Sequence, residues 1–245
     1  MINALRHDAV LQLTLARPDK KNAINAQMYR ALTEALVNAE KDDAIRAVLF
    51  TGEGDSFCAG NDLVEFAAAA RDASGSRDAV AFLHALADAT KPFVAAVQGK
   101  AVGIGTTLLL HCDFVVLAED AQLSTPFVNL GLVPEAGSSA LLPQRIGHVL
   151  AFEMIALGKA IQAPRALQLG IANEVVPNAQ LHTRAMQAAQ DLATRPIGAL
   201  RATKQLMRDA RSLHTVIDQE VQVFGERLRS AEAQTALRAF LTRGR

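Results

Sequence analysis

The sequence predicts an α/β fold with a helical region at its C-terminal end. Strand and helix patterns alternate over the first two-thirds of the 245 residues, whereas nearly everything after Asn178 has a helical pattern. Half of the residues are hydrophobic and a fifth are charged, as in ordinary globular proteins. We therefore expect an α/β core over residues 1–190 and a helical region over residues 191–245.

Five short segments are expected to form strands. Leucines alternate with polar residues over 11–15, which is the period of a half-buried strand. Residues 47–51, 92–97 and 113–118 are apolar runs that end in glycine-containing or acidic turns, as buried strands do. Residues 171–176 form a later strand pattern that ends at a proline.

The expected helices have recognisable start and stop signals. Asn25 can cap a helix whose apolar stripe runs from Met28 to Ala39. The patterns over 149–157 and 164–169 each end at a glycine. In the helical region, apolar stripes along the later helices are wider than one thin layer on a core would need, which predicts an oligomer.

The composition excludes several classes of protein. Lys plus Arg and Asp plus Glu both number 25, so the formal net charge is zero, whereas nucleic-acid-binding proteins usually have a basic excess. No apolar run reaches the roughly 20 residues of a membrane-spanning helix, and the first residues do not resemble a signal peptide. The two cysteines form neither a disulfide framework nor a closely spaced metal-binding pair. We expect a cytoplasmic protein that binds no nucleic acid, membrane or metal.

Two glycine-containing turns are candidates for a binding site. The first has the sequence FCAGNDL at 57–63, and the second is Gly103-Ile104-Gly105 at the start of a short apolar helix. The second turn is not a dinucleotide-binding loop, because Leu108 occupies the position of the third glycine. Backbone N–H groups from two such turns can form an oxyanion hole. Two ordinary tight turns are the alternative interpretation.

Further motifs surround these turns in a fixed order. They are RP at 17–18, NAIN at 22–25, KP at 91–92, CD at 112–113 and LGLVPEAG at 130–137. In the order and spacing of these motifs, nearly the whole chain resembles the crotonase, or enoyl-CoA hydratase/isomerase, superfamily. The resemblance implies a spiral of ββα units with a C-terminal helical trimerisation region. It also implies an acyl-CoA thioester substrate, whose thioester oxygen is held by the backbone N–H groups of Asn61 and Ile104.

The sequence departs from the hydratases of this superfamily at two positions. Those hydratases have two catalytic glutamates, and the matching positions here are Thr107 and Phe127. Hydration of a double bond needs one group to activate water and another to deliver a proton. Because neither side chain can do this, we do not expect efficient hydration.

Glu135 is the candidate acid that remains in this neighbourhood. Residues 130–133 before it are apolar, and an apolar environment raises the pKa of a carboxyl group. A favourable charge at a helix N-terminus is the alternative role, with Ser138 and Ser139 capping that helix. Around Glu135 the chain resembles the Δ3,Δ2-enoyl-CoA isomerases most closely, which implies that Glu135 is a single proton shuttle.

The resemblance also implies which residues contact CoA, and it implies no cofactor beyond the CoA moiety of the substrate. Lysines in a loop would meet the nucleotide end, although solvated lysines are the alternative. An aromatic–basic pair near the C-terminus would reach CoA, sometimes from a neighbouring subunit. The implied CoA-binding residues are Lys20, Lys21, Ala23, Ala59, Leu63, Phe240 and Arg243.

Three functions are therefore considered. The first is an isomerase that converts a 3-enoyl-CoA to a 2-enoyl-CoA through a dienolate. The second is another crotonase reaction, namely isomerisation of an aromatic epoxyacyl-CoA, thioester hydrolysis or hydratase-like chemistry. The third is a non-catalytic acyl-CoA-binding protein, which would have no need of Glu135. By resemblance the protein is a homotrimer or a dimer of trimers. The expected walls of the acyl pocket include Val64, Phe66, Phe82 and Phe127.

Overall fold

A central sheet organises the part of the chain that the computed structural model describes, residues 1–65 and 75–243. Its six strands have the order β1-β2-β3-β4-β6-β9. β1 and β2 are antiparallel, and each of the other neighbouring pairs is parallel. The strands are β1 (Ile2–His7), β2 (Val10–Leu15), β3 (Ala47–Gly52), β4 (Phe93–Val97), β6 (Phe114–Ala118) and β9 (Glu174–Val176).

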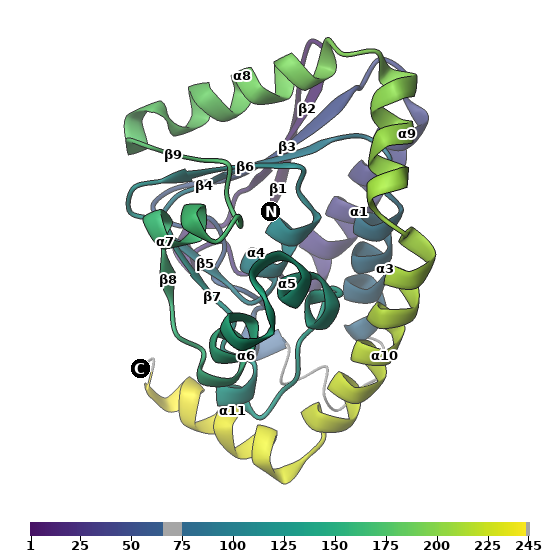
Figure 1. Ribbon diagram of the computed structural model, residues 1–245. Coiled ribbons are helices and arrows are strands. Elements are labelled where there is room, and N and C mark those ends of the chain that lie inside the picture. Colours follow the sequence, from purple (N-terminus) through teal and green to yellow (C-terminus); the bar gives the residue numbers. More distant parts are fainter. Residues whose placement is uncertain (66–74, 244–245) are drawn as a thin grey trace.

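A smaller sheet lies beside the central one (Figure 1). Its strands have the order β5-β7-β8, and they are β5 (Lys100–Val102), β7 (Gln122–Ser124) and β8 (Ile161–Gln162). The β5–β7 pair is parallel and the β7–β8 pair is antiparallel. Because β5 follows β4 almost directly, this sheet begins at the end of a central strand and leads into the short helix α4.

Helices cover both faces of the central sheet and then extend beyond it. The α-helices are α1 (Ala26–Lys41), α3 (Gly75–Asp88), α4 (Ile104–Thr107), α5 (Ser138–Ile146), α6 (His148–Leu157), α7 (Ala163–Gln168), α8 (Leu181–Ala193), α9 (Ile197–Met207), α10 (Ala210–Leu228) and α11 (Ala231–Arg243). The 3-10 helices are η1 (Pro18–Lys20), η2 (Leu108–His111), η3 (Val128–Leu130) and η4 (Asn178–Gln180). This arrangement confirms the predicted α/β class with a helical C-terminal region.

The parallel strands β3, β4 and β6 are buried on both faces, as parallel strands usually are, whereas most residues of the edge strand β1 are exposed. On one face, side chains such as Leu49 and Val116 pack against alanines of α8. On the other face, Phe50 and Phe93 join a larger core that includes apolar residues of α1 and α3. Figure 1 shows α8 lying across one side of the sheet and α1 and α3 on the other side.

Two details of the sequence analysis are resolved by the structure. The cap of α1 is confirmed, because the side chain of Asn25 accepts a hydrogen bond from the Met28 N–H. The strand expected over 171–176 was too long, since β9 begins only at Glu174. Ile171 instead donates its N–H to the Ala166 carbonyl at the end of α7. Asn173 then pairs with the backbone of Val115 through both its N–H and its side-chain oxygen.

The C-terminal helices continue around the outside of the core. The predicted boundary at residue 190 falls within α8, and α9, α10 and α11 then run along one side and the base of the molecule (Figure 1). The buried Lys204 of α9 donates to the Asp113 carboxylate at 2.7 Å and to the Lys91 carbonyl at 2.8 Å. On α10, His214 pairs with Asp88 of α3 at 2.7 Å. Several contacts therefore dock these helices onto the core.

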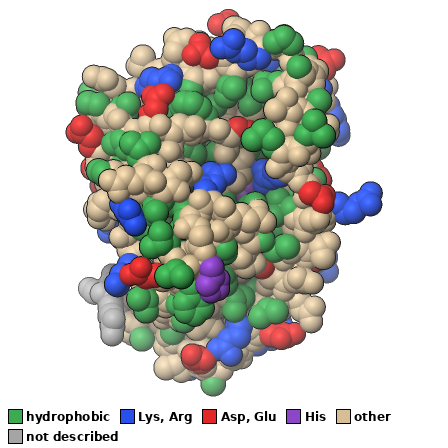
Figure 2. All heavy atoms as spheres, viewed as in Figure 1, with side chains coloured by type: hydrophobic (Ala, Val, Ile, Leu, Met, Phe, Trp, Pro, Cys, Tyr) green, Lys and Arg blue, Asp and Glu red, His purple; other side chains and the backbone are tan. Residues whose placement is uncertain are grey.

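The surface carries both signs of charge. Figure 2 shows acidic and basic side chains interspersed on the visible face, without a large patch of one sign. Over the described ranges, no helix combines the length and the apolarity needed to cross a membrane.

Candidate active site

The two glycine-containing turns lie side by side because the first turn pairs with β5, the strand that leads into the second turn. Cys58 pairs with Ala101 of β5, and Asn61 pairs with Ile24. The Val102 N–H donates to the Cys58 carbonyl at 2.8 Å. At Gly105, an added Cβ would lie 2.7 Å from the Cys58 carbonyl oxygen, so only glycine allows this close approach.

These turns leave the backbone N–H groups of Asn61 and Ile104 free to bind a ligand. The neighbouring groups Gly60 C=O and Asp62 N–H are both hydrogen-bonded to Ile24, so the Asn61 N–H points to the other side. Ile104 is the first residue of α4, where an N–H group has no partner within the helix. Neither N–H group donates to an acceptor among the described residues. Such groups can stabilise an oxyanion.

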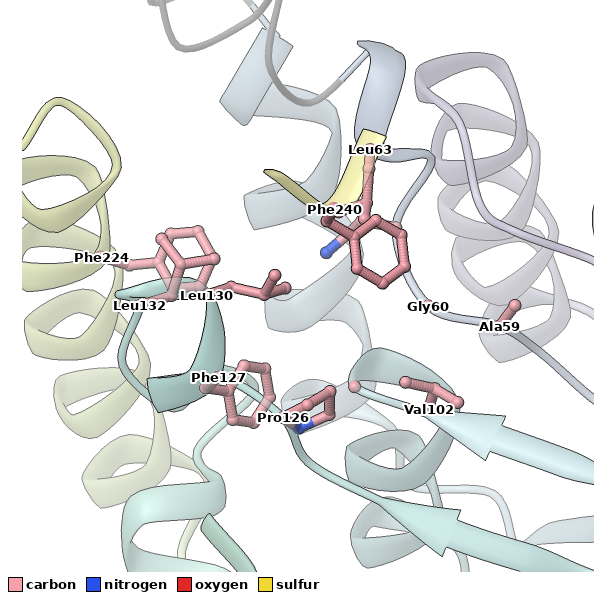
Figure 3. Close-up of a pocket in the computed structure, with 12 residues that line it drawn as sticks. Ala59, Gly60, Leu63, Val102, Pro126, Phe127, Leu130, Leu132, Phe224 and Phe240 are labelled. Carbon is pink, nitrogen blue, oxygen red and sulfur yellow. The ribbon is translucent and has the colours of Figure 1, made fainter. Parts of the chain in front are cut away.

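A pocket of about 100 Å³ adjoins both turns. Asn61 and Gly103 contribute to its lining, and the remaining walls are mostly apolar. Figure 3 shows Phe240 beside Leu63, with Phe224, Leu130 and Leu132 grouped on another side. An apolar pocket beside free N–H groups suits a ligand with an apolar chain and one polar oxygen.

The predicted pocket walls are correct only in part. Phe127 lines the pocket. Phe82 does not, because it is fully buried in the core against the ring of Tyr29, with the ring centroids 5.6 Å apart. Val64 is 68% exposed at the surface and is not a lining residue. Phe66 lies outside the described residues.

Glu135 is a buried acid that is attached to α4. Its Oε1 accepts a hydrogen bond from the Thr107 hydroxyl at 2.6 Å, and Glu135 is only 8% exposed. Burial raises the pKa of Glu135 to about 8; the Thr107 hydrogen bond opposes this rise, and the Glu220 charge adds to it. Glu135 is not among the pocket-lining residues, whereas Leu130 and Leu132 of the same segment are.

The turn that contains Glu135 is held by residues that the sequence analysis did not single out. His111 is fully buried, and its Nε2–H donates to the Ala136 carbonyl at 2.7 Å because Arg208 donates to Nδ1. Burial and the Arg208 charge lower the pKa of His111 to about 3, so the ring is neutral. Glu220 of α10 accepts hydrogen bonds from the Gly137 and Ser139 N–H groups.

This arrangement corrects the expected cap of α5. Neither serine caps the helix: the N-cap residue is Gly137, and the Ser138 hydroxyl donates back to the Glu135 carbonyl at 2.6 Å. The cap comes from Glu220, which is distant in the sequence. The sequence does carry a signal for this cap, because Glu220 places an acidic side chain on the same helix face as the buried Leu213 and Ile217.

A further buried group is hydrogen-bonded to the first turn. The hydroxyl of Tyr29, the single tyrosine of the chain, donates to the Asn61 side-chain oxygen at 2.6 Å. Burial and the nearby Glu135 charge raise the pKa of Tyr29 well above its usual value. Burial likewise raises the pKa of Cys58 to about 12. Both groups therefore remain protonated next to Glu135.

The Asp62 carboxylate is bound by neighbouring groups of the protein. Its carboxylate forms an ion pair with Arg17 at 2.6 Å and accepts the Val64 N–H at 3.0 Å. Burial raises the pKa of Asp62, but these hydrogen bonds outweigh burial and hold the pKa below its ordinary value. Asp62 is therefore ionised and engaged within its own turn.

The residues expected to contact CoA fall into four groups. Ala59, Leu63 and Phe240 line the pocket. Lys20 and Lys21 are exposed and do not line the pocket, and Lys21 forms an ion pair with Asp55 at 2.5 Å. Ala23 is partly buried, and its carbonyl accepts a hydrogen bond from Arg17. Arg243 is the last residue of α11, and its side chain lies outside the described part of the structure. Within the described ranges, no group of three or more metal-binding side chains is arranged to hold a metal ion.

Comparison with known proteins identifies the family. Residues 6–245 match the sequence profile described as Enoyl-CoA hydratase/isomerase. The chain belongs to this family. The match confirms the resemblance to the crotonase superfamily. The glycine-containing turns and the segment of Glu135 all lie within the matched residues.

Relatives of this enoyl-CoA hydratase/isomerase family member have different activities. A rat protein named Enoyl-CoA delta isomerase 2 is 37% identical over 96% of this chain, which spans 61% of the length of that relative. The 1,2-epoxyphenylacetyl-CoA isomerase of Escherichia coli K12 is 36% identical, with coverage of 96% of this chain and 92% of the relative. An enoyl-CoA hydratase/isomerase structure from Pseudoalteromonas atlantica T6c has a TM-score of 0.93 at 36% identity, covering 99% of this chain and 97% of the other. This structural similarity confirms the crotonase fold.

Proposed function

We propose that this family member is a Δ3,Δ2-enoyl-CoA isomerase in which Glu135 carries the proton. The observation that supports this proposal is the buried Glu135 carboxyl, which is hydrogen-bonded to the same short helix that begins at Ile104. A base with a pKa near the working pH is well suited to take up and return a proton. The 37% identical rat relative, which is named an enoyl-CoA delta isomerase, supports the same reaction.

The proposed reaction moves one proton and one double bond. The Glu135 carboxylate removes a proton from C2 of a 3-enoyl-CoA, and the electron pair of that C–H bond passes into a dienolate. The N–H groups of Asn61 and Ile104 donate to the thioester oxygen, where the negative charge collects. The protonated Glu135 then delivers its proton to C4, which leaves the C2=C3 double bond and restores the carboxylate.

The neighbours of Glu135 favour this single-acid reaction over hydration. Thr107 uses its hydroxyl to donate to Glu135, and Phe127 is a buried apolar wall of the pocket. Neither side chain can activate water or supply a second proton. A protein that only bound acyl-CoA would also gain nothing from a buried carboxyl group with a raised pKa, since burial of such a group opposes its ionisation.

Isomerisation of an aromatic epoxyacyl-CoA is the second candidate reaction. The pocket contains three phenylalanines, Phe127, Phe224 and Phe240, whose rings can pack against an aromatic acyl group. The 36% identical relative from Escherichia coli is named 1,2-epoxyphenylacetyl-CoA isomerase. The same oxyanion donors would serve both reactions, so the substrate decides between them.

We further propose that the substrate is held through its CoA moiety and that no other cofactor takes part. Ala59, Leu63 and Phe240, which line the pocket, would lie along the CoA, with Lys20, Lys21, Ala23 and Arg243 as the remaining contacts. The assembly proposed is a homotrimer or a dimer of trimers. Support comes from large apolar side chains at the surface, since Phe152 is 63% exposed and Leu206 is 89% exposed. Light scattering that finds a monomer at micromolar concentration would contradict the assembly.

The proposed function is tested with three substrates. A 3-enoyl-CoA, crotonyl-CoA and 1,2-epoxyphenylacetyl-CoA are each incubated with the protein, and the products are separated by chromatography. We expect conversion of the 3-enoyl-CoA to the conjugated 2-enoyl-CoA, with negligible formation of 3-hydroxybutyryl-CoA from crotonyl-CoA. Efficient hydration would show that another pair of acids exists. Turnover of the epoxide alone would favour the second candidate.

A further inference from the structure

The turn of Glu135 is connected to α10 by one buried carboxylate. Glu220 Oε2 accepts the Gly137 N–H at 2.6 Å, and Oε1 accepts the Ser139 N–H at 2.8 Å. Glu220 is only 7% exposed although it belongs to a helix on the outside of the molecule. The two N–H groups stand at the N-terminal end of α5, where a negative charge is favoured and where no side chain of α5 itself forms a cap.

The same face of α10 also closes over this turn sterically. A Cβ at Gly137 would lie 2.4 Å from Cδ1 of Leu213, which is seven positions before Glu220 and therefore on the same helix face. Ala136 and Gly137 have positive φ angles of 60° and 71°. For Ala136 this conformation is unfavourable, so it persists only where surrounding contacts impose it. Glu220 supplies two of those contacts.

Charged and titratable groups approach Glu135 from several elements. Tyr29 of α1 and Cys58 of the first turn are both neutral, since the pKa of each is raised. His111 of η2 is neutral as well, and the Arg208 guanidinium lies behind it. Burial is the main cause of the raised pKa of Glu135, and the negative charge of Glu220 adds to it. Glu220 does not line the pocket, and both of its carboxylate oxygens are engaged by the Gly137 and Ser139 N–H groups.

We propose that Glu220 is a positioning residue that holds the Glu135 turn in its reactive conformation, so that docking of α10 completes the active site. This inference rests on the proposed role of Glu135 as the base. Glu220 is not needed to attach α10, because Leu213 and Ile217 are buried beside it and His214 pairs with Asp88. Its carboxylate can therefore be changed while the helix remains docked.

Two variants separate the effect of the Glu220 charge from the effect of its side-chain length. In Glu220→Gln the amide oxygen can still accept one N–H group, but the amide nitrogen cannot accept the second. We expect kcat for a 3-enoyl-CoA to fall by about 10–100-fold, KM to change little, and the acidic limb of the pH–kcat profile to move to lower pH. In Glu220→Asp the charge remains but the side chain is shorter, so kcat falls while the acidic limb stays in place.

The matched control is Glu226→Gln, which makes the same chemical change at an exposed position of α10. It should leave kcat and the pH profile unchanged. Glu220→Gln with wild-type kcat and a wild-type acidic limb would overturn the proposal. If Glu220→Gln does not fold, a wild-type kcat for Glu220→Asp would overturn it instead, because the shortened side chain cannot keep both hydrogen bonds.

A measurement without substrate distinguishes this proposal from the proposed function. The Glu135 carboxyl is titrated by ¹³C NMR, with its resonance assigned by its absence in Glu135→Gln. We expect the Glu135 pKa to be lower in Glu220→Gln than in the wild type, and an unchanged pKa would contradict the effect of Glu220. If that pKa falls while Glu135→Gln remains fully active, the role of Glu135 as the base fails but the influence of Glu220 on it stands.

Discussion

The two halves of the candidate active site are built in different ways. The two glycine-containing turns are held by backbone contacts within the core, such as the bridges between Cys58 and Ala101 and between Ile24 and Asn61. The Glu135 turn is held by side chains, namely His111 of η2 on Ala136 and Glu220 of the C-terminal helix α10 on Gly137. Under the proposed function, binding of the thioester oxygen thus depends on the spiral core, whereas placement of the acid also depends on the C-terminal helices.

The largest effect expected from this difference concerns the acid itself. Glu135→Gln preserves the shape of the side chain but removes the base, so isomerisation of a 3-enoyl-CoA should fall by roughly 10²–10⁴-fold. Affinity for an acyl-CoA should change little, because the Asn61 and Ile104 N–H groups remain. Steady-state kinetics and calorimetric binding measure the two quantities.

The control for this variant is Asp62→Asn. An asparagine oxygen can still accept the Val64 N–H that Asp62 now accepts, so turnover should remain measurable. Near-full activity of Glu135→Gln together with loss of activity in Asp62→Asn would indicate that Asp62, and not Glu135, is the base.

An intermediate effect is expected where the two oxyanion turns touch. In Gly105→Ala the new Cβ would lie 2.7 Å from the Cys58 carbonyl oxygen, and backbone atoms would have to shift. A displacement of the Ile104 donor should lower kcat by about 100-fold. The control is Gly198→Ala in α9, where the added Cβ meets no described atom within 4 Å. Full kcat in Gly105→Ala would show that the spacing of the two turns is not critical.

The smallest effect concerns the Thr107 hydrogen bond and its influence on the pKa of Glu135. Since the base must be ionised, activity should rise with pH through about 8, the pKa of Glu135. Thr107→Val removes the hydrogen bond that favours the carboxylate, so this pKa and the acidic limb should move up by about one pH unit. Activity at neutral pH then falls about tenfold, because one pH unit reduces the ionised fraction by that factor.

The control for this shift is Thr203→Val at an exposed position of α9. A pH–rate profile of both variants compares them directly. An acidic limb of Thr107→Val that stays in place, or moves to lower pH, would contradict the hydrogen bond as a determinant of the Glu135 pKa.

Residues with local signals were found from the sequence, and residues with distant partners were not. Asn25, the strands of the central sheet and the glycine-containing turns follow from spacing, capping and backbone freedom, which act over a few residues. Glu135 stood out because acids were missing at Thr107 and Phe127. Tyr29, His111 and Glu220 were missed, since their hydrogen-bond partners Asn61, Ala136 and Gly137 are far away in the chain.

By itself, the sequence determined an α/β member of the enoyl-CoA hydratase/isomerase family with two glycine-containing turns and one candidate acid. These properties depend on the types and order of residues, which folding does not alter. The tertiary structure decided that Glu135 is buried with a raised pKa, and that α5 is capped by Glu220 rather than by its own serines. The Glu220 contact, which spans 83 positions, exists only after α10 has docked, and the burial of Glu135 arises from the combined packing of many separate segments.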